Sequence, residues 1–424
     1  MDPVHEIVDA VKADDVARAA ACMDRHPELS ARLNDALPGL SFDGTLLLAA
    51  VSHQNRPMID LLLQRGADIN QRSHWWAGGF GVLDSDHDLT DFLVERGATM
   101  DIHAAARRGR ADTVRTMLDR DRTLARARGG DGQTPLHVAT TVEVAQLLLD
   151  AGAEIDARDV DHESTPAQYA IRERQDVVRF LVGKGCTTDV LMAAALGDSD
   201  LVRRHLETNP AAIATTVSPR WFPMVNPRAG GTIYIWTLGG GKSAHTIARE
   251  FGHNETFRLL MDRSSPQLAL AAACEVADEP LAVAILQNHP DAAKSMDADV
   301  QRKIVDAAEN NSTDTVRLML RAGWPVSARG KHGATPLHFG AWHGNATMVR
   351  EILRHRPEVE AIDYDFRMSA LGWAFHGSVH GWNSARGDYG GTVEGLLDAG
   401  AAVPAGSESR EMSPAIRTVL SRRV

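Results

Sequence analysis

The stretch Thr134-Pro135-Leu136-His137-Val138-Ala139, followed by Leu147-Leu148-Leu149-Asp150-Ala151-Gly152-Ala153-Glu154, decides the fold of this chain. The hydroxyl of Thr134 can cap a helix, and Pro135 suits the first helical position because its missing N–H would have no helical partner. The leucines recur at helical spacing, and Gly152 supplies a left-handed helix end. The stretch therefore predicts two short amphipathic helices joined by a turn.

The same two-helix pattern recurs along the chain. The helix start returns as Thr335-Pro336-Leu337-His338 and, more weakly, at Thr165-Pro166-Ala167, Ser243-Ala244-His245 and Ser369-Ala370-Leu371. The helix end returns at 61–68, 92–98, 180–186 and 396–401, and Gly152 and Gly185 lie 33 positions apart. A single two-helix unit cannot bury its apolar face alone, so the units must stack on one another.

These residues resemble the ankyrin-repeat family, and the resemblance covers nearly the whole chain, more faintly at both ends and around 265–300. It implies an all-α ankyrin-repeat solenoid of about 12 helix-turn-helix units with projecting loops or hairpins, called fingers below. We expect the array over 1–405 and a capping helix within 406–424. The expected units lie near 3–29, 44–66, 82–97, 102–119, 134–152, 165–185, 190–208, 243–264, 266–288, 301–322, 335–355 and 369–399.

Three segments depart from the repeat. Residues 73–81 place Trp75 and Trp76 among glycines and predict an irregular loop. In 217–242, three prolines exclude a continuous helix, and the alternating run 232–237 predicts an elongated hairpin. In the last repeat we expect Gly377 to end a helix, followed by an insertion over 378–391. Residues 241–243 read Gly-Lys-Ser, but Trp236 stands where a phosphate-binding loop needs glycine, so we expect no nucleotide site.

Composition and charge limit the classes of partner and the cellular location that we expect for this protein. The formal net charge of −11 argues against nucleic acid, which requires a basic surface. The chain shows neither a secretory signal nor an apolar run long enough for a membrane span. Its three cysteines form neither a disulfide framework nor a zinc-binding spacing. We expect a cytoplasmic protein, and the excess of arginine over lysine favours a bacterial source.

Tryptophan and histidine point to a binding surface. None of the eight tryptophans falls in a leucine-rich second helix, and the family resemblance implies that fingers and first helices line a concave groove. Trp342 and His343 occupy the variable positions before the helix-ending Gly344. We expect a protein or peptide partner in that groove, because such side chains dominate binding hot spots. The expected binding residues are His74, Trp75, Trp76, His162, Tyr234, Trp236, His332, Trp342, His343, Trp373, His376, His380, Trp382 and Tyr389.

One alternative stays open at this point: the insertions could enclose an aromatic and histidine-rich pocket of an enzyme or a small-molecule receptor. Its candidate residues are His162, His332, His376, His380, Asp86 and Tyr234. The finger residues Asp159, Asp161, His162 and Glu163 could serve as acid and base, or their carboxylates could hold the turn. Since the sequence contains no recognised nucleophile, metal or cofactor motif, we expect no catalytic residue, no metal site and no cofactor.

Overall fold

The computed structural model describes residues 2–85, 88–404, 406–407 and 410–423. Within these ranges the regular secondary structure is helical, without a β-strand. The chain divides into two compact units. Unit 1 comprises Met1–Thr188 with Ser218–Leu238, and unit 2 comprises Asp189–Val217 with Gly239–Val424.

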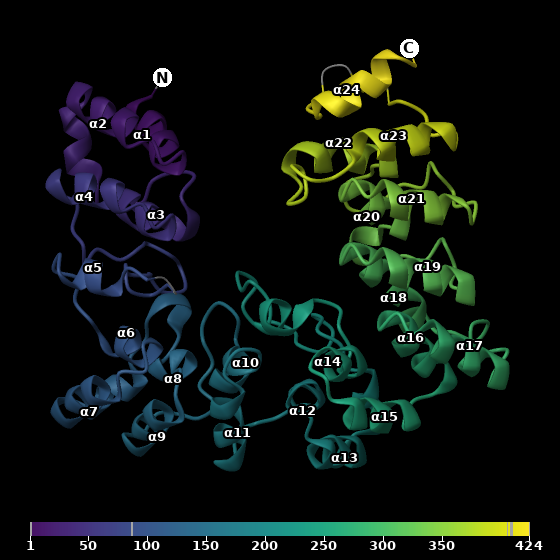
Figure 1. Cartoon of the computed structure of the whole chain (residues 1–424), viewed down its shortest axis with the longest axis horizontal. Helices are drawn as coiled ribbons and strands as arrows, with labels where there is room; N and C mark the ends of the chain where they lie inside the picture. The colour runs from purple at the N-terminus through teal and green to yellow at the C-terminus, as the bar shows by residue number, and fades with distance from the viewer. Residues whose placement is uncertain (1, 86–87, 405, 408–409, 424) are drawn as a thin grey trace. The chain divides into compact units, whose positions relative to one another are not determined.

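Unit 1 holds the first eleven α-helices labelled in Figure 1. They are α1 (Pro3–Lys12), α2 (Val16–Arg25), α3 (Leu46–Ser52), α4 (Arg56–Gln64), α5 (Thr90–Val94), α6 (Ile102–Arg107), α7 (Ala111–Arg120), α8 (Pro135–Val138), α9 (Val142–Asp150), α10 (Pro166–Ala170) and α11 (Gln175–Gly183). Short 3-10 helices follow or connect them at Pro27–Arg32, Ser41–Asp43, Arg122–Arg126 and Gly130–Gly132, and a π-helical turn lies at Ile235–Gly239.

Unit 2 holds the remaining helices. They are α12 (Val190–Leu196), α13 (Ser199–Thr208), α14 (Ala244–Glu250), α15 (Asn254–Asp262), α16 (Pro266–Glu275), α17 (Glu279–Asn288), α18 (Ala298–Glu309), α19 (Thr313–Ala322), α20 (Pro336–Trp342), α21 (Ala346–Leu353), α22 (Ala370–His380), α23 (Tyr389–Asp398) and α24 (Pro414–Ser421). Two 3-10 helices lie at Pro210–Ala214 and Lys331–Gly333.

The helices stack by type, as a solenoid requires. First helices pack on first helices, for example α6 on α8 and α20 on α22, and second helices pack on second helices, for example α7 on α9 and α21 on α23. Leucines such as Leu62, Leu148 and Leu396 are fully buried between neighbouring pairs. Each such burial stabilises the fold by about 1.5–3 kcal/mol. The C-terminal helix α24 packs on α23 through the buried Ile416.

The expected pair at 82–97 is the exception, because the described residues there contain only α5. The segment before α5 forms turns instead of a first helix. The carboxylate of Asp84 accepts the N–H of Gly81 at 2.7 Å and pairs with the guanidinium of Arg72 at 2.5 Å. These contacts hold the chain in a turn conformation that a helix could not satisfy.

Histidines at the helix starts link consecutive repeats. The Nδ1 atom of His137 accepts the N–H of Thr134 at 3.0 Å, and its Nε2 atom donates to the carbonyl of Ser164 in the next repeat at 3.1 Å. His338 makes the same pair of contacts in a later repeat: Nδ1 accepts the N–H of Thr335, and Nε2 donates to the carbonyl of Met368 in the repeat that follows. His245, at the same position of its repeat, makes no such link through Nε2, which meets the Ser264 hydroxyl of its own repeat at 2.8 Å.

The hairpin expected over 217–242 does not form. Its two ends meet in a single antiparallel bridge between Thr216 and Ser243, and residues Ile235–Gly239 form a π-helical turn. Several backbone N–H groups of this insertion donate instead to the finger at 159–164. The Glu163 carboxylate accepts the N–H groups of Val225 and Asn226, at 2.8 and 2.7 Å.

The insertion in the last repeat is shorter than the predicted 378–391. Helix α22 continues through Gly377 to His380, and α23 already begins at Tyr389, so the connecting loop covers 381–388. Gly377 lies inside α22, and a Cβ atom there would come within 2.3 Å of the carbonyl oxygen of Trp342, so the glycine allows close packing of α22 on α20. None of the described helices is long and apolar enough to cross a membrane.

Candidate functional site

Neighbouring fingers are joined through their backbones. The N–H of Val160 donates to the carbonyl of Asp131 at 2.8 Å, and the N–H of Tyr364 donates to the carbonyl of His332 at 2.8 Å. Gly132, with a φ of +69°, permits the first of these contacts, since a Cβ atom there would lie 2.3 Å from Val160 Cγ2. Consecutive fingertips therefore lie side by side.

In five fingers the same position lies three residues before the N-cap residue of the first helix that follows. We call it the fingertip position. Because the fingers stack in register, the side chains at the fingertip positions of consecutive repeats lie close together, as Asp131 and His162 do and as His332 and Phe366 do. The fingertip position is occupied by Phe42, Asp131, His162, His332 and Phe366.

In unit 1, the loop at 73–81 packs against the fingertips. The ring of Phe42 lies 5.3 Å from the Trp75 ring, edge to face, and 5.0 Å from the Phe80 ring. The Trp75 Nε1–H donates to a carboxylate oxygen of Asp131 at 3.0 Å. His74 is exposed. Phe42, in the finger before α3, is 51% exposed, so aromatic surface faces solvent beside this loop.

The insertion 218–238 contributes further aromatic residues to unit 1. The Arg228 guanidinium lies 4.5 Å from the centre of the Trp76 ring. Trp236 is 58% exposed and its ring lies 4.7 Å from that of His162. Tyr234, in contrast, is fully buried. Of these predicted site residues, Trp236 offers the largest free face.

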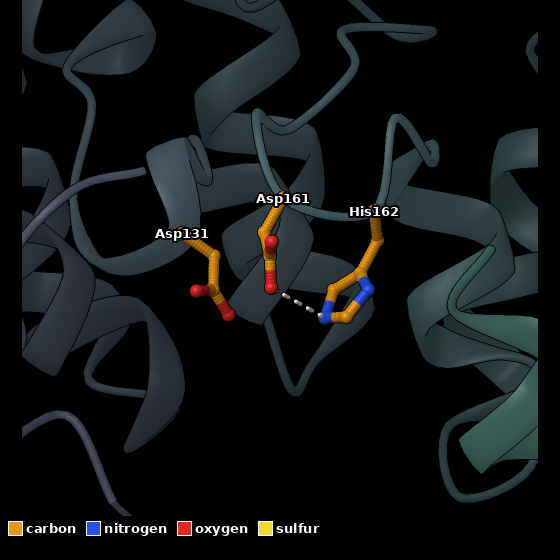
Figure 2. Close-up of side chains that lie close together, drawn as sticks. All are labelled: Asp131, Asp161 and His162. Carbon is orange, nitrogen blue, oxygen red and sulfur yellow. Dashed lines mark ion pairs between the residues drawn. The ribbon is translucent and has the colours of Figure 1, made fainter. Parts of the chain in front are cut away.

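At the fingertips of unit 1, Asp131, Asp161 and His162 converge, as Figure 2 shows. All three side chains are buried, and one ligand-type atom of each lies within 4.8 Å of the others. The Asp161 Oδ2 and His162 Nε2 atoms are 3.6 Å apart. On its other edge, the imidazole Nδ1–H of His162 donates to the carbonyl of Gly231 at 2.8 Å. Asp161 and His162 of this cluster were candidates from the sequence, and Asp131 was not predicted.

Burial sets the electrostatics of this cluster. Burial raises the pKa of Asp131 to about 6, with His162 opposing the shift and Asp161 adding to it. Burial also raises the pKa of the neighbouring Asp159. The Asp159 carboxylate accepts hydrogen bonds from the N–H groups of His162 and Ser164, so it holds the turn, as one of the two sequence interpretations proposed.

In unit 2, Trp373 forms the centre of an aromatic cluster. It is only 5% exposed, and its Nε1–H donates to the Asp363 carboxylate at 3.0 Å. The rings of Phe339 and Trp342 lie 5.2 and 6.1 Å from it. Trp373 therefore supports the surface from beneath and presents little of its own area to a partner.

A row of rings runs across this cluster. Phe366 contacts Trp373 at 6.0 Å, and Trp342 joins Trp373 to His376, at 6.1 and 5.7 Å. His332 closes the fingertip end, 5.0 Å from Phe366. We call these five residues the aromatic row. Phe366 is 53% exposed, His376 is exposed and Trp342 is half-buried.

Because α22 continues through Gly377, His376 and His380 lie on one helical face, contrary to the expectation that the helix would end between them. Their rings are 4.5 Å apart. Burial and the neighbouring His380 lower the pKa of His376. His380 also contacts the Glu411 carboxylate through Nε2 at 3.0 Å.

The remaining predicted residues of unit 2 differ in exposure. Trp382 is 71% exposed and lies 5.0 Å from the ring of His343, which is buried and donates through Nε2 to the Glu309 carbonyl at 2.8 Å. Tyr389 is buried, and its hydroxyl lies 2.8 Å from the carbonyl oxygens of both Trp342 and Gly377, which share its single proton. His343 and Tyr389 therefore fasten backbone segments together.

Three protein-family models match segments of the chain, and all three describe ankyrin repeats. A model described as "Ankyrin repeats (3 copies)" matches residues 82–159 and 102–191. A model described as "Ankyrin repeats (many copies)" matches 304–351, and one described as "Ankyrin repeat" matches 42–71. This chain is an ankyrin-repeat protein.

Two curated proteins are similar to parts of this chain. The chain is 34% identical over 112 residues, 26% of its length, to "Serine/threonine-protein kinase VIK" of Arabidopsis thaliana. It is 36% identical over 70 residues, 16% of its length, to "Ankyrin repeat domain-containing protein 49" of Bos taurus. The matches span 26% and 29% of those relatives' own lengths, so the chain covers less than a third of each.

Ankyrin repeats are protein-interaction modules, so the general expectation of a protein partner stands. The alternative of a pocket formed by the insertions draws on loops of both units, since 73–81 and 218–238 belong to unit 1 and 381–388 to unit 2. Asp86 lies outside the described residues. The surface hollow of about 520 Å³ lies on the second helices α21 and α23, and its lining contains none of the predicted site residues.

Proposed function

We propose that unit 2 binds a protein or peptide partner over the aromatic row and the neighbouring Trp382. The observation that carries this proposal is the exposure of three large aromatic side chains on two consecutive repeats: Tyr364 at 64%, Phe366 at 53% and Trp382 at 71%. Contiguous exposed apolar surface is uncommon on soluble proteins unless it serves a contact. The finger and first-helix location of these residues also fits what the ankyrin resemblance implies.

The packing beneath the row supports recognition by a rigid surface. Trp373 is fixed by its hydrogen bond to Asp363, which also accepts the N–H groups of Phe366 and Met368. The half-buried Trp342 leans on Trp373. Because these rings are already ordered, a partner would bind them at a low cost in side-chain entropy. Such pre-ordered aromatic residues are typical centres of binding energy.

Charged groups of both signs surround the row and favour a partner with an apolar centre. The Arg329 guanidinium lies 4.9 Å from the centre of the Tyr364 ring, and His332 contacts the Asp365 carboxylate at 2.8 Å. Lys331 pairs with Glu309 at 3.1 Å. A polar rim around an apolar centre is the usual anatomy of a protein interface. We therefore propose a peptide segment with two or three apolar side chains as the bound element.

The three cysteines are buried free thiols, which supports our proposal of a reducing, cytoplasmic location. Tyr234, Trp373 and Tyr389 are buried, so we leave them out of the contact surface and assign them to packing. His74, Trp75, Trp76 and Trp236 lie in unit 1 and stay predictions for a second contact.

Peptide display on the full-length protein tests the proposal. Peptides selected on the wild type are titrated by fluorescence anisotropy against the double variant Phe366→Ala, Trp382→Ala. The expected result is binding weaker by about tenfold or more, because hot-spot truncation costs more than about 1–2 kcal/mol. The matched control is Trp236→Ala, which removes a tryptophan of unit 1 that is also more than half exposed and should leave affinity unchanged. A selection in which no peptide loses affinity for the double variant would contradict the proposal.

A further inference from the structure

The cluster of Asp131, Asp161 and His162 in unit 1 holds two carboxylates and one imidazole with little access to solvent. Their side chains belong to residues that are only 7%, 6% and 8% exposed. In the described part of the chain, neither carboxylate pairs with a lysine or an arginine, and the ion pair recorded here joins Asp161 to His162. Burying two carboxylates without a lysine or arginine partner costs folding free energy, so a bound cation would stabilise this site.

The hydrogen bonds of His162 fix which of its nitrogens can bind a ligand. A carbonyl oxygen only accepts, so the 2.8 Å contact with Gly231 requires the proton to be on Nδ1. In the neutral imidazole, Nε2 then carries a lone pair. That lone pair faces Asp161 Oδ2 at 3.6 Å, which is too long for a hydrogen bond. A histidine held by a carbonyl at one nitrogen and open at the other is the usual arrangement of a metal ligand.

The spacing of the ligand atoms fits a metal ion. Two ligands of a tetrahedral zinc ion, each at about 2.1 Å, lie about 3.4 Å apart, close to the 3.6 Å between Asp161 Oδ2 and His162 Nε2. A carboxylate oxygen of Asp131 lies within 4.8 Å of a carboxylate oxygen of Asp161 and of a ring nitrogen of His162. In Figure 2 both carboxylates and the Nε2 edge of the ring point toward the same space. One Asp131 oxygen accepts the Trp75 Nε1–H, which orients the carboxylate.

Neighbouring carboxylates are already occupied and do not extend the ligand set. The Asp159 oxygens accept the N–H groups of His162 and Ser164 and the hydroxyl of Tyr169. The Glu163 oxygens accept two backbone N–H groups of the insertion. Three protein ligands therefore converge, which leaves a fourth position to water.

We propose that Asp131, Asp161 and His162 bind a divalent transition-metal ion, with zinc(II) as the ion that this donor set favours. The imidazole nitrogen selects against magnesium and calcium, which prefer oxygen ligands throughout. The ion joins two consecutive fingers. It also stiffens the insertion, because Gly230 and Gly231 are hydrogen-bonded to Asp161 and His162. The site would thus lock the finger surface of unit 1 independently of the aromatic row.

Calorimetric titration of the chelator-treated full-length protein with zinc chloride tests this site. The wild type should bind one equivalent that Asp161→Asn binds at least tenfold more weakly, while magnesium chloride gives no such binding. The matched control is His376→Gln, because His376 and His380 form an exposed pair on α22 that could also hold zinc. Loss of the equivalent in His376→Gln but not in Asp161→Asn would overturn the proposal, as would the absence of zinc binding by the wild type.

A melting experiment keeps the test decisive if Asp161→Asn folds poorly. Zinc should raise the unfolding temperature of the wild type and of His332→Gln, which alters a fingertip at the same repeat position in unit 2. It should not raise that of Asp131→Asn, whose fold without metal is checked by circular dichroism. An equal shift in Asp131→Asn and the wild type would show that zinc binds elsewhere.

Discussion

Replacement of His137 by glutamine should make the protein less sensitive to acid. His137 is fully buried, and both of its ring nitrogens are engaged: Nδ1 accepts from Thr134 and Nε2 donates to Ser164. A second proton on Nδ1 would remove the Thr134 contact. The neighbouring repeat shows that glutamine fits the same position, since the Gln168 Oε1 atom accepts the N–H of Thr165 at 2.9 Å.

The magnitude follows from the pKa of His137. Burial lowers this pKa to about 3, whereas an unfolded histidine titrates near 6.5. The unfolded state therefore takes up the proton first, so the stability that the neutral His137 provides is present above about pH 6.5 and is lost as pH falls toward 3. At about pH 5 the loss is about 2 kcal/mol, from 1.5 pH units at about 1.4 kcal/mol each.

Urea unfolding at about pH 7 and about pH 5, followed by circular dichroism, measures this effect. At the higher pH, His137→Gln should be less stable than the wild type by about 1 kcal/mol, because the hydrogen bond to Ser164 is lost. At the lower pH this deficit should disappear or reverse. His355→Gln, which removes an exposed histidine, is the control. A difference between His137→Gln and the wild type that does not change with pH would refute the reasoning.

Three further substitutions test the packing. Leu148→Ala removes a fully buried leucine and should lower the free energy of unfolding by about 2–5 kcal/mol, measured by urea titration. Lys303→Met removes the ammonium group that lies 2.6 Å from the buried Glu275 carboxylate and should lower the free energy of unfolding by about 3–5 kcal/mol. Arg302→Met, on the exposed face of the same helix, should lower it little. Equal losses in the two variants would contradict the importance of the Lys303–Glu275 pair. Trp382→Ala should leave the melting temperature within a few degrees of the wild type, because that side chain is mostly exposed.

The helix pairs were predictable because their signals are local. The Thr-Pro start, the leucine spacing and the terminal glycine act within one repeat, and the structure confirms helices wherever these signals occur together. The helix-ending glycines Gly66, Gly152 and Gly400 all have the positive φ that the pattern predicts. Burial of Leu148 follows from the same periodicity.

The errors arose where tertiary contacts override local preference. The run 232–237 alternates like a strand, yet its backbone bonds to the finger of an earlier repeat: the N–H of Ile233 donates to the Ser164 hydroxyl at 3.1 Å. Gly377 reads as a helix end, but it lies inside α22, where the missing Cβ lets the helix approach Trp342 closely. Neither contact can be inferred from the neighbouring residues alone.

The residues of the candidate sites also divide into those that local sequence signals predict and those that only tertiary contacts bring together. Exposed aromatic residues such as Trp382 were predicted from their place outside the second helices. The cluster in unit 1 was missed because Asp131 and Asp161 are 30 positions apart in sequence. Aligning the repeats gives the missing signal, since Asp131 and His162 hold the same fingertip position in consecutive repeats, and so do His332 and Phe366.

Hydrogen–deuterium exchange of the full-length protein, with and without a saturating display-selected peptide, tests the central claim most directly. Recognition by the aromatic row predicts slower exchange in 331–342 and 364–382 and unchanged exchange in 73–81 and 218–238. Protection confined to the second helices or to the loops of unit 1 would contradict the claim that the finger surface of unit 2 binds the partner.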